Sequence, residues 1–252
     1  MMKFINLSLT TSFFVGLLTL SMPSNATIVL FETNMGDFEV NLLDNDTPKT
    51  VANFLKYVEA KGYSNAIVHR SMPGFITQGG GFTYNTETTA VEDAMLFASV
   101  VNEPVFSNVR GTIAMAKKGT DENSATNQWF FNGADNAANL DNQNGGFTVF
   151  GVVTGDGMEI IDAINDLPTY SIQGLSAFTD TPLQTEPTGN GITDEHYVII
   201  ESITVVNANQ DTQPALPPLS TAKEEDDSDS SGGSNGLYML GLLALVRLFR
   251  RS

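Results

Sequence analysis

Hydrophobic and polar residues alternate along residues 27–42, which predicts a β-hairpin. β-branched and aromatic residues dominate this stretch, and Phe38, Val40 and Leu42 alternate with polar residues. Residues 34–36 read Asn-Met-Gly and supply a turn. Since successive side chains of a strand point to opposite faces, we expect the hairpin to bury one face and leave the other in water.

Two later stretches have helical periodicity. The first begins at Thr47, a favourable N-cap, and Pro48, a favourable first residue, and ends at Gly62; its apolar stripe is Val51, Phe54, Leu55 and Val58. The second covers residues 157–167 and stops at Pro168; its apolar stripe is Ile160, Ile161, Ile164 and Leu167.

Several further segments are short and β-like: 66–69, 111–116, 128–132, 148–153 and 197–206. Many short strands and only two helices favour a mainly β fold, a closed antiparallel barrel capped by the two helices. Periodicity alone specifies neither the strand order nor a role for the long insertion at 168–195.

The N-terminal segment, residues 1–26, has the pattern of a secretory signal peptide. Lys3 gives it a basic start, residues 13–20 are an apolar run, and Ser24-Asn25-Ala26 place small residues at a cleavage site. We expect cleavage after Ala26 and export to the periplasm or beyond. The alternative interpretation is a buried first helix.

The C-terminal segments differ in composition from the rest of the chain. Residues 207–231 are rich in proline, serine and acid, which predicts a disordered acidic linker. Residues 232–252 contain a glycine pair, an apolar stretch at 237–246 and three arginines. This order resembles the GlyGly-CTERM tail of Gram-negative exported proteins, which implies cleavage near the glycines and then surface attachment or release. The alternative is a permanent membrane anchor, and any membrane contact is expected through this segment alone.

Composition narrows the chemistry of the remaining single domain, residues 27–206. The 252-residue chain has 12 basic and 29 acidic residues, a formal charge of −17, no cysteine and two histidines. This balance argues against binding the nucleic-acid backbone. The lack of cysteine excludes disulfides and thiolate catalysis, and any Ser-His-Asp triad has to use His69 or His196.

Several segments are unusual for loops and lie in a fixed order: 69–82, 110–117, 124–132, 139–141 and 145–151. They contain the sequences HRSMPGFITQGG, GTIAMA, SATNQWFF, LD and VFG. Together they resemble the cyclophilin-type peptidyl-prolyl cis-trans isomerases in their bacterial exported form. The resemblance covers essentially all of residues 27–206. It implies an eight-stranded barrel with two helices and an open substrate groove.

The resemblance also implies roles for particular residues. Arg70 stands at the position of the catalytic arginine and Gln78 at that of the glutamine that binds the substrate backbone. The expected substrate-binding positions are Phe75, Ile76, Ala116, Lys117, Gln128, Phe130, Leu140 and Phe147. Lys117 replaces a frequent asparagine. Asn139 stands where Trp or Phe is usual, a departure that bears on pocket contacts and on cyclosporin affinity.

The chemistry of these residues fits the same reaction. Rotation about an X–Pro bond faces a barrier of about 20 kcal/mol from amide resonance, and no bond has to break. The reaction therefore requires no nucleophile, metal or cofactor, only tighter binding of the twisted amide. An apolar cup can hold the proline ring, and the permanently charged Arg70 can donate to the amide nitrogen as it loses conjugation. The expected partners are proline-containing unfolded or partly folded polypeptides, bound by a monomer.

Other interpretations remain open at this level. Arg70 is one of two arginines in the domain and could pair with a carboxylate, and the phenylalanines could be ordinary core. Glycines 79–81 could suggest a phosphate loop and residues 141–146 a calcium loop, although both lack required ligands. As a whole, the domain could serve as a peptide-binding chaperone or adaptor with little turnover, or as a structural surface protein.

Overall fold

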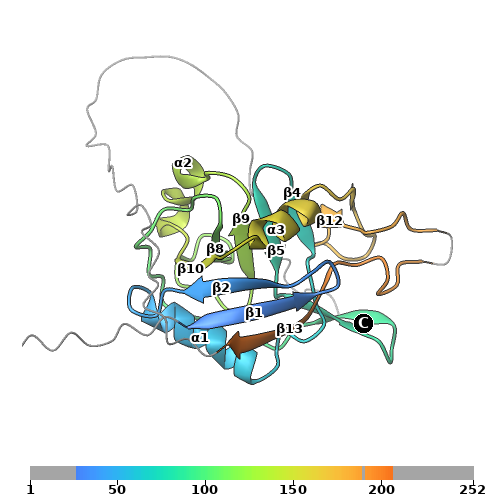
Figure 1. Cartoon of the computed structure of the whole chain (residues 1–252), viewed down its shortest axis with the longest axis horizontal. Helices are drawn as coiled ribbons and strands as arrows, with labels where there is room; N and C mark the ends of the chain where they lie inside the picture. The colour runs from blue at the N-terminus through green and yellow to red at the C-terminus, as the bar shows by residue number, and fades with distance from the viewer. Residues whose placement is uncertain (1–26, 189–190, 207–252) are drawn as a thin grey trace, which may run out of the picture.

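The computed structural model describes residues 27–188 and 191–206 (Figure 1). The predicted signal peptide at 1–26, the linker at 207–231 and the tail at 232–252 lie outside these residues. Within the described part, no helix is both long and apolar enough to cross a membrane.

The predicted N-terminal hairpin is present. Strands β1 (Ile28–Thr33) and β2 (Phe38–Leu42) pair antiparallel, with Phe31 opposite Phe38. Gly36 in the turn has φ +124°, a conformation that favours glycine. Alternate residues of β1 are buried, so the period of two in the sequence corresponds to an inward and an outward face.

One antiparallel sheet contains most of the strands and curls strongly on itself. Its order is β4 (Arg70–Met72), β5 (Ile76–Gly79), β9 (Trp129–Asn132), β8 (Thr112–Met115), β10 (Val149–Val153), β2, β1, β13 (Ile199–Val206), β3 (Ala66–Ile67), β6 (Phe82–Asn85) and β7 (Ala90–Asp93). A separate two-stranded sheet pairs β11 (Thr169–Tyr170) with β12 (Thr181–Pro182).

The strand count and the closure differ from the expected eight-stranded closed barrel, because the sheet has 11 strands. The expected strand at 66–69 divides at Val68 and His69: the Val68 N–H bonds to Val198, just before β13, and the His69 N–H bonds to Gln78 of β5. The chain therefore bends from β3 into β4 and brings the two sides of the sheet together. The mainly β, antiparallel fold class is confirmed. The two sides of the sheet are joined through this bend, and β6 and β7 form a hairpin at the end of the sheet next to β3.

Helices α1 (Pro48–Glu59) and α3 (Gly157–Asn165) correspond to the two predicted helices. The prediction for Thr47 was wrong in one respect: its hydroxyl donates to the Leu43 carbonyl and does not cap the helix. The carboxylate of Glu103 accepts from the Thr50 N–H at 2.8 Å and satisfies the helix end instead. A short helix α2 (Ala137–Leu140) and the 3₁₀ turn η1 (Gln143–Gly145) add to the two.

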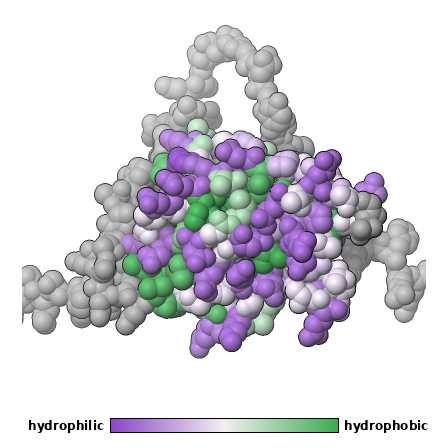
Figure 2. Space-filling view, turned by 45° about the vertical axis from the view of Figure 1, so that its right-hand side comes forward, coloured by the Kyte–Doolittle hydropathy of each residue, from purple (hydrophilic) through white to green (hydrophobic). Residues whose placement is uncertain are grey.

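An aromatic core fills the curled sheet. The Phe31 ring lies 5.4 Å from the Trp129 ring and 5.5 Å from the Phe131 ring, both edge-on. Hydrophilic residues cover much of the surface in Figure 2, with smaller hydrophobic areas between them. The large hydrophobic side chains exposed on the described surface include Met95, Leu96, Val101 and Val105.

Close packing against Trp129 and Gln128 accounts for glycines 79–81. A Cβ on Gly79 would lie 2.7 Å from the Trp129 ring, and one on Gly81 would lie 2.5 Å from the Gln128 amide. At Gly80, where φ is +83°, a Cβ would lie 2.6 Å from the Asn127 carbonyl oxygen. The glycine run therefore lets β5 approach its neighbours, which is a structural explanation for the motif.

Gly80→Ala is expected to reduce the free energy of unfolding by about 2 kcal/mol or more, because left-handed strain and a backbone clash act together. Gly119→Ala is the matched control: Gly119 has φ +58° and open space around it. That control should cost only about 1 kcal/mol. Urea titration of both variants measures the difference, and equal losses would contradict the role of close packing.

Candidate active site

A row of paired residues crosses three strands on the outer face of the sheet. Arg70 of β4 lies opposite Gln78 of β5, and Gln78 lies opposite Phe130 of β9. Directly paired residues in antiparallel strands project to the same face. The intervening row, which includes Phe131, belongs to the aromatic core on the other face. The strand register thus places an arginine, a glutamine and a phenylalanine side by side.

An apolar cluster lies beside this row and contains most of the expected pocket residues. Its buried members are Leu43, Ile76, Ala114, Ala116, Phe130, Leu140, Phe147 and Val149, and the partly buried Phe75 packs against them. The Phe130 and Phe147 rings meet at 5.7 Å and 77°. Residues from β5, β8, β9, α2 and the loop before β10 therefore converge on one place.

The floor of the cluster is tightly packed. Phe130 and Leu140 are each 3% exposed and Phe147 is 7% exposed. Phe75, Gln128 and Arg70 are only partly buried. We call these three partly buried residues the rim of the site, and the nearly fully buried Phe130, Leu140 and Phe147 its floor.

The two predicted glutamines contact each other. The Gln78 amide donates to the Gln128 carbonyl oxygen at 2.9 Å. This bond orients both side chains between the arginine and the apolar cluster. The remaining amide N–H and carbonyl groups of this pair have the chemistry to hydrogen-bond to a peptide backbone.

Arg70 has a limited set of protein contacts. Its Nε lies 3.8 Å from the Asp180 carboxylate, and its Nη2 donates to the Met72 sulfur at 2.8 Å. Burial lowers the pKa of Arg70 and the nearby Asp180 raises it. Because the ordinary pKa of a guanidinium lies far above neutral pH, the group keeps its charge. The side chain is 20% exposed, so a mostly buried cation lies beside the apolar cluster.

Lys117 takes a different place from the one its sequence position implied. Its ammonium donates to the carbonyls of Asn144 and Gly146, each at 2.6 Å, and lies 4.7 Å from the Phe147 ring centre. The residue is 1% exposed. Burial lowers the pKa of Lys117 to about 8, against the opposing effect of Glu122 and Asp121. Its charged group therefore braces the loop behind Phe147, away from solvent.

A buried network of amide side chains supports the apolar cluster, and the sequence analysis missed it. Asn108 donates to Asp141 and to the carbonyl of Phe147, at 3.0 and 3.1 Å. Asn136 donates to the carbonyl of Phe75 at 3.0 Å and to Asn132 at 2.8 Å. The network fixes the backbone of two cluster residues. Asparagines crowd residues 132–144, but sequence alone does not separate buried amides from ordinary turn residues.

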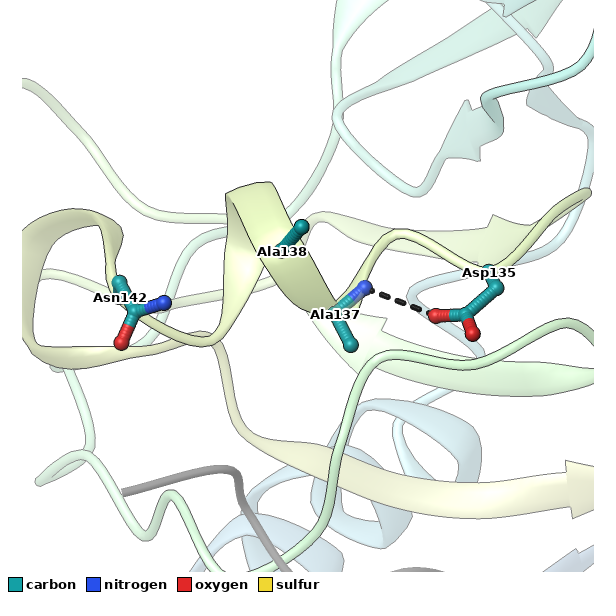
Figure 3. A pocket seen from close by; sticks show the side chains of 4 residues that line it. All are labelled: Asp135, Ala137, Ala138 and Asn142. Atoms are coloured by element: carbon teal, nitrogen blue, oxygen red, sulfur yellow. Dashed lines mark hydrogen bonds between the residues drawn. The ribbon is translucent and has the colours of Figure 1, made fainter. Parts of the chain in front are cut away.

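A hollow of about 430 Å³ lies on the outer side of α2 (Figure 3). Asp135, Ala137, Ala138 and Asn142 line it, and the Asp135 carboxylate accepts from the Ala137 N–H at 3.1 Å. Asn139, where an aromatic residue is usual in the resembled family, is exposed on the same short helix. None of the predicted site residues lines this hollow, so it is separate from the Arg70 row.

Comparison with known proteins identifies the family. The family model "Cyclophilin type peptidyl-prolyl cis-trans isomerase/CLD" matches residues 28–186, more than half of the chain. The curled antiparallel sheet with few helices agrees with that fold. The chain therefore belongs to the cyclophilin-type peptidyl-prolyl cis-trans isomerase family.

Curated relatives carry the same description. A peptidyl-prolyl cis-trans isomerase of Acinetobacter baylyi is 38% identical over 157 residues, 61% of this chain and 80% of that protein. Peptidyl-prolyl cis-trans isomerase B of Escherichia coli is 36% identical over 183 residues, 71% of this chain and 99% of that protein.

A solved structure supports the fold assignment independently. A Cryptosporidium parvum cyclophilin-type isomerase superimposes with a TM-score of 0.51 at 23% identity, over 75% of this chain and 99% of that one.

His69 precedes Arg70 and is enclosed by aromatic rings. Its ring lies 5.1 Å from Phe82 and 5.7 Å from Phe178, and its Nδ1 has no hydrogen-bond partner among the described residues. The pKa of His69 is lowered to about 4: burial is the main cause, a backbone hydrogen bond to Ile67 opposes it, and the charge of Arg70 adds a smaller decrease. The imidazole is therefore neutral at ordinary pH and structural in character.

Acid is expected to destabilise the fold through His69. The unfolded chain takes up the proton near pH 6.5 and the folded chain only near pH 4, so stability is complete above 6.5 and falls as pH decreases between these values. The loss from this residue reaches about 3 kcal/mol at the acid end. Urea midpoints of wild type and His69→Gln from pH 7 to 4 test this. An identical pH slope in both proteins would overturn the assignment.

Proposed function

We propose that Arg70 and the adjacent apolar cluster carry out the peptidyl-prolyl cis-trans isomerase activity of this family on proline-containing polypeptides. The observation that carries the proposal is the Arg70–Gln78–Phe130 row at the edge of the cluster. One face thus offers a fixed cation, amide groups and an apolar surface, the three features that X–Pro rotation requires.

The mechanism involves no covalent step. As the X–Pro amide twists, its nitrogen loses conjugation and gains a lone pair, to which a guanidinium N–H of Arg70 donates. The apolar cluster and the Phe75 side chain hold the pyrrolidine ring, while Gln78 and Gln128 hold the backbone of the residues on either side of the proline. Because the hydrogen bond from Arg70 is stronger to the twisted amide than to either planar form, the barrier to rotation about the X–Pro bond falls.

The proposed substrates are unfolded or partly folded exported polypeptides. The Cryptosporidium parvum isomerase was also solved in the presence of the dipeptide Ala-Pro, and that structure superimposes on this chain with a TM-score of 0.50. This supports a proline-containing ligand. Uncatalysed proline isomerisation takes tens of seconds, so catalysis of this step accelerates folding. We expect the protein to act as a monomer.

The place of action is part of the proposal. The pattern of residues 1–26 supports export to the periplasm or cell surface of a Gram-negative bacterium, and residues 232–252 support a cleaved or anchored C-terminus. Mass spectrometry of the mature protein tests both ends. An intact C-terminal Ser252 on the exported protein would contradict cleavage.

A second candidate is a peptide-binding module with weak turnover. The low exposure of Phe130, Leu140 and Phe147 favours it, because a packed floor leaves little room for a proline ring. Asn139 in place of an aromatic residue points the same way. Peptide affinity that is retained without any isomerisation would support this second function.

Arg70→Ala is expected to reduce kcat/KM by about 100-fold, the lower end of what loss of a single electrostatic donor causes in other enzymes. A protease-coupled assay with a proline peptide measures the rate. Arg110→Ala is the matched control, since Arg110 pairs with Asp162 at 2.5 Å on the half-exposed surface. Unchanged activity in Arg70→Ala would falsify the catalytic role.

The rate is expected to be nearly flat between about pH 6 and 7, because Arg70 stays charged, Lys117 with its pKa of about 8 keeps its proton, and the glutamines do not titrate. His69, with a pKa of about 4, is neutral throughout this range. Peptide assays in constant ionic strength buffers measure the profile. A step near pH 6 to 7 would instead implicate a histidine.

A further inference from the structure

Residues 178–181 of the insertion lie along the outer edge of strand β4, the strand that carries Arg70 (Figure 1). The N–H of Ser71 donates to the Asp180 carbonyl at 2.8 Å, and the Thr181 hydroxyl donates to the His69 carbonyl at 2.9 Å. Both neighbours of Arg70 are thus bonded to the same short segment. The segment therefore lies against the edge of β4 that has no strand partner in the sheet.

An aromatic anchor fixes this segment in place. Phe178 is fully buried, with its ring 4.9 Å from Phe82 and 5.7 Å from His69. Strand β12, which begins at Thr181, pairs with β11 on its other side. The position of Asp180 is therefore set by buried contacts on both sides, although its own side chain is 43% exposed.

The Asp180 carboxylate contacts only one end of the Arg70 guanidinium. Its Oδ2 lies 3.8 Å from Nε, whereas Nη2 contacts the Met72 sulfur, a weak acceptor that a stronger one can replace. Arg70 makes no other side-chain hydrogen bond or ion pair that is recorded within the described residues. The arrangement places a negative charge at the Nε end of the guanidinium, gives Nη2 only a weak acceptor, and leaves Nη1 without a side-chain partner among the described residues.

We propose that Asp180 is a positioning residue for catalysis, which orients the Arg70 guanidinium through Nε and so aims its outer N–H groups at the X–Pro amide. The inference rests on the proposed function, because it assigns Asp180 a role only through Arg70. It also gives a role to part of the insertion at 168–195: residues 178–181 act as a support for the catalytic strand.

Asp180→Asn tests the proposal with little change of shape, since the backbone carbonyl that accepts from Ser71 remains. The partly exposed pair predicts a decrease in kcat of about three- to fivefold with KM nearly unchanged, because orientation matters most in the twisted state. Asp180→Glu keeps the charge and is expected to recover most of the activity. Asp162→Asn, which removes the carboxylate of the remote Arg110 pair, is the matched control and should leave kcat unchanged.

A double-mutant cycle separates this proposal from the proposed function. In the Arg70→Ala background, Asp180→Asn is expected to have no further effect on the residual rate. If Arg70→Ala lowers the rate but Asp180→Asn leaves it unchanged or raises it, the positioning role is overturned and the catalytic role stands. If Arg70→Ala has no effect, both fail. A loss in Asp180→Asn that persists without Arg70 would also overturn the proposal, since the effect would then be structural.

Discussion

The register between β4, β5 and β9 is the constraint on which the site depends. Arg70, Gln78 and Phe130 are separated by up to 60 residues in the sequence, yet they lie in one row because each is directly paired with the next. A slip of one residue would turn each of these side chains into the aromatic core and bring Phe131 to the outside. Glycines 79–81 help to fix this register, because Trp129 and Gln128 occupy the space that larger residues would need.

Polar groups around the apolar cluster are arranged so that their burial is tolerated. Unpaired buried polar groups are costly, and those in the network behind Phe75 and Phe147 largely bond to one another or to the backbone. Asn108 and Asn136 thereby hold the backbone of Phe147 and Phe75 without adding a charge of their own. Lys117 does add a charge, but two carbonyls and an aromatic ring surround it. The backbone around Phe75 and Phe147 is therefore held by hydrogen bonds, whereas the buried side chains of the cluster are held by packing.

Much of the fold follows from local pattern, and the exceptions have physical causes. The hairpin at 28–42 and the helix at 48–59 could be predicted because their apolar residues keep a single period. The role of Glu103 at the start of α1 could not, because it comes from more than 50 residues away in the sequence. The bend at Val68 and His69 was missed for a similar reason: the β-like pattern is continuous there, and only the strands paired on each side divide it.

Prediction of the site shows the same division. Motif order identified the residues that converge on the cluster, including Ile76, Leu140 and Phe147, although they come from different elements. It did not foresee the position of the Lys117 ammonium or the contact between Arg70 and Asp180. Both depend on loops whose conformation is set by contacts between distant parts of the chain.

Arg70 and Lys117 show how burial acts on two kinds of cation near the apolar cluster. Burial lowers the pKa of both Arg70 and Lys117, and for the lysine the result is a pKa of about 8 despite two nearby acids. At this pKa the Lys117 ammonium begins to lose its proton as the pH approaches 8. A guanidinium starts from a much higher pKa, so it can lose solvent on one side and remain a full charge. In the proposed mechanism, desolvation would strengthen the interaction of Arg70 with the twisted amide without removing the proton on which that interaction depends.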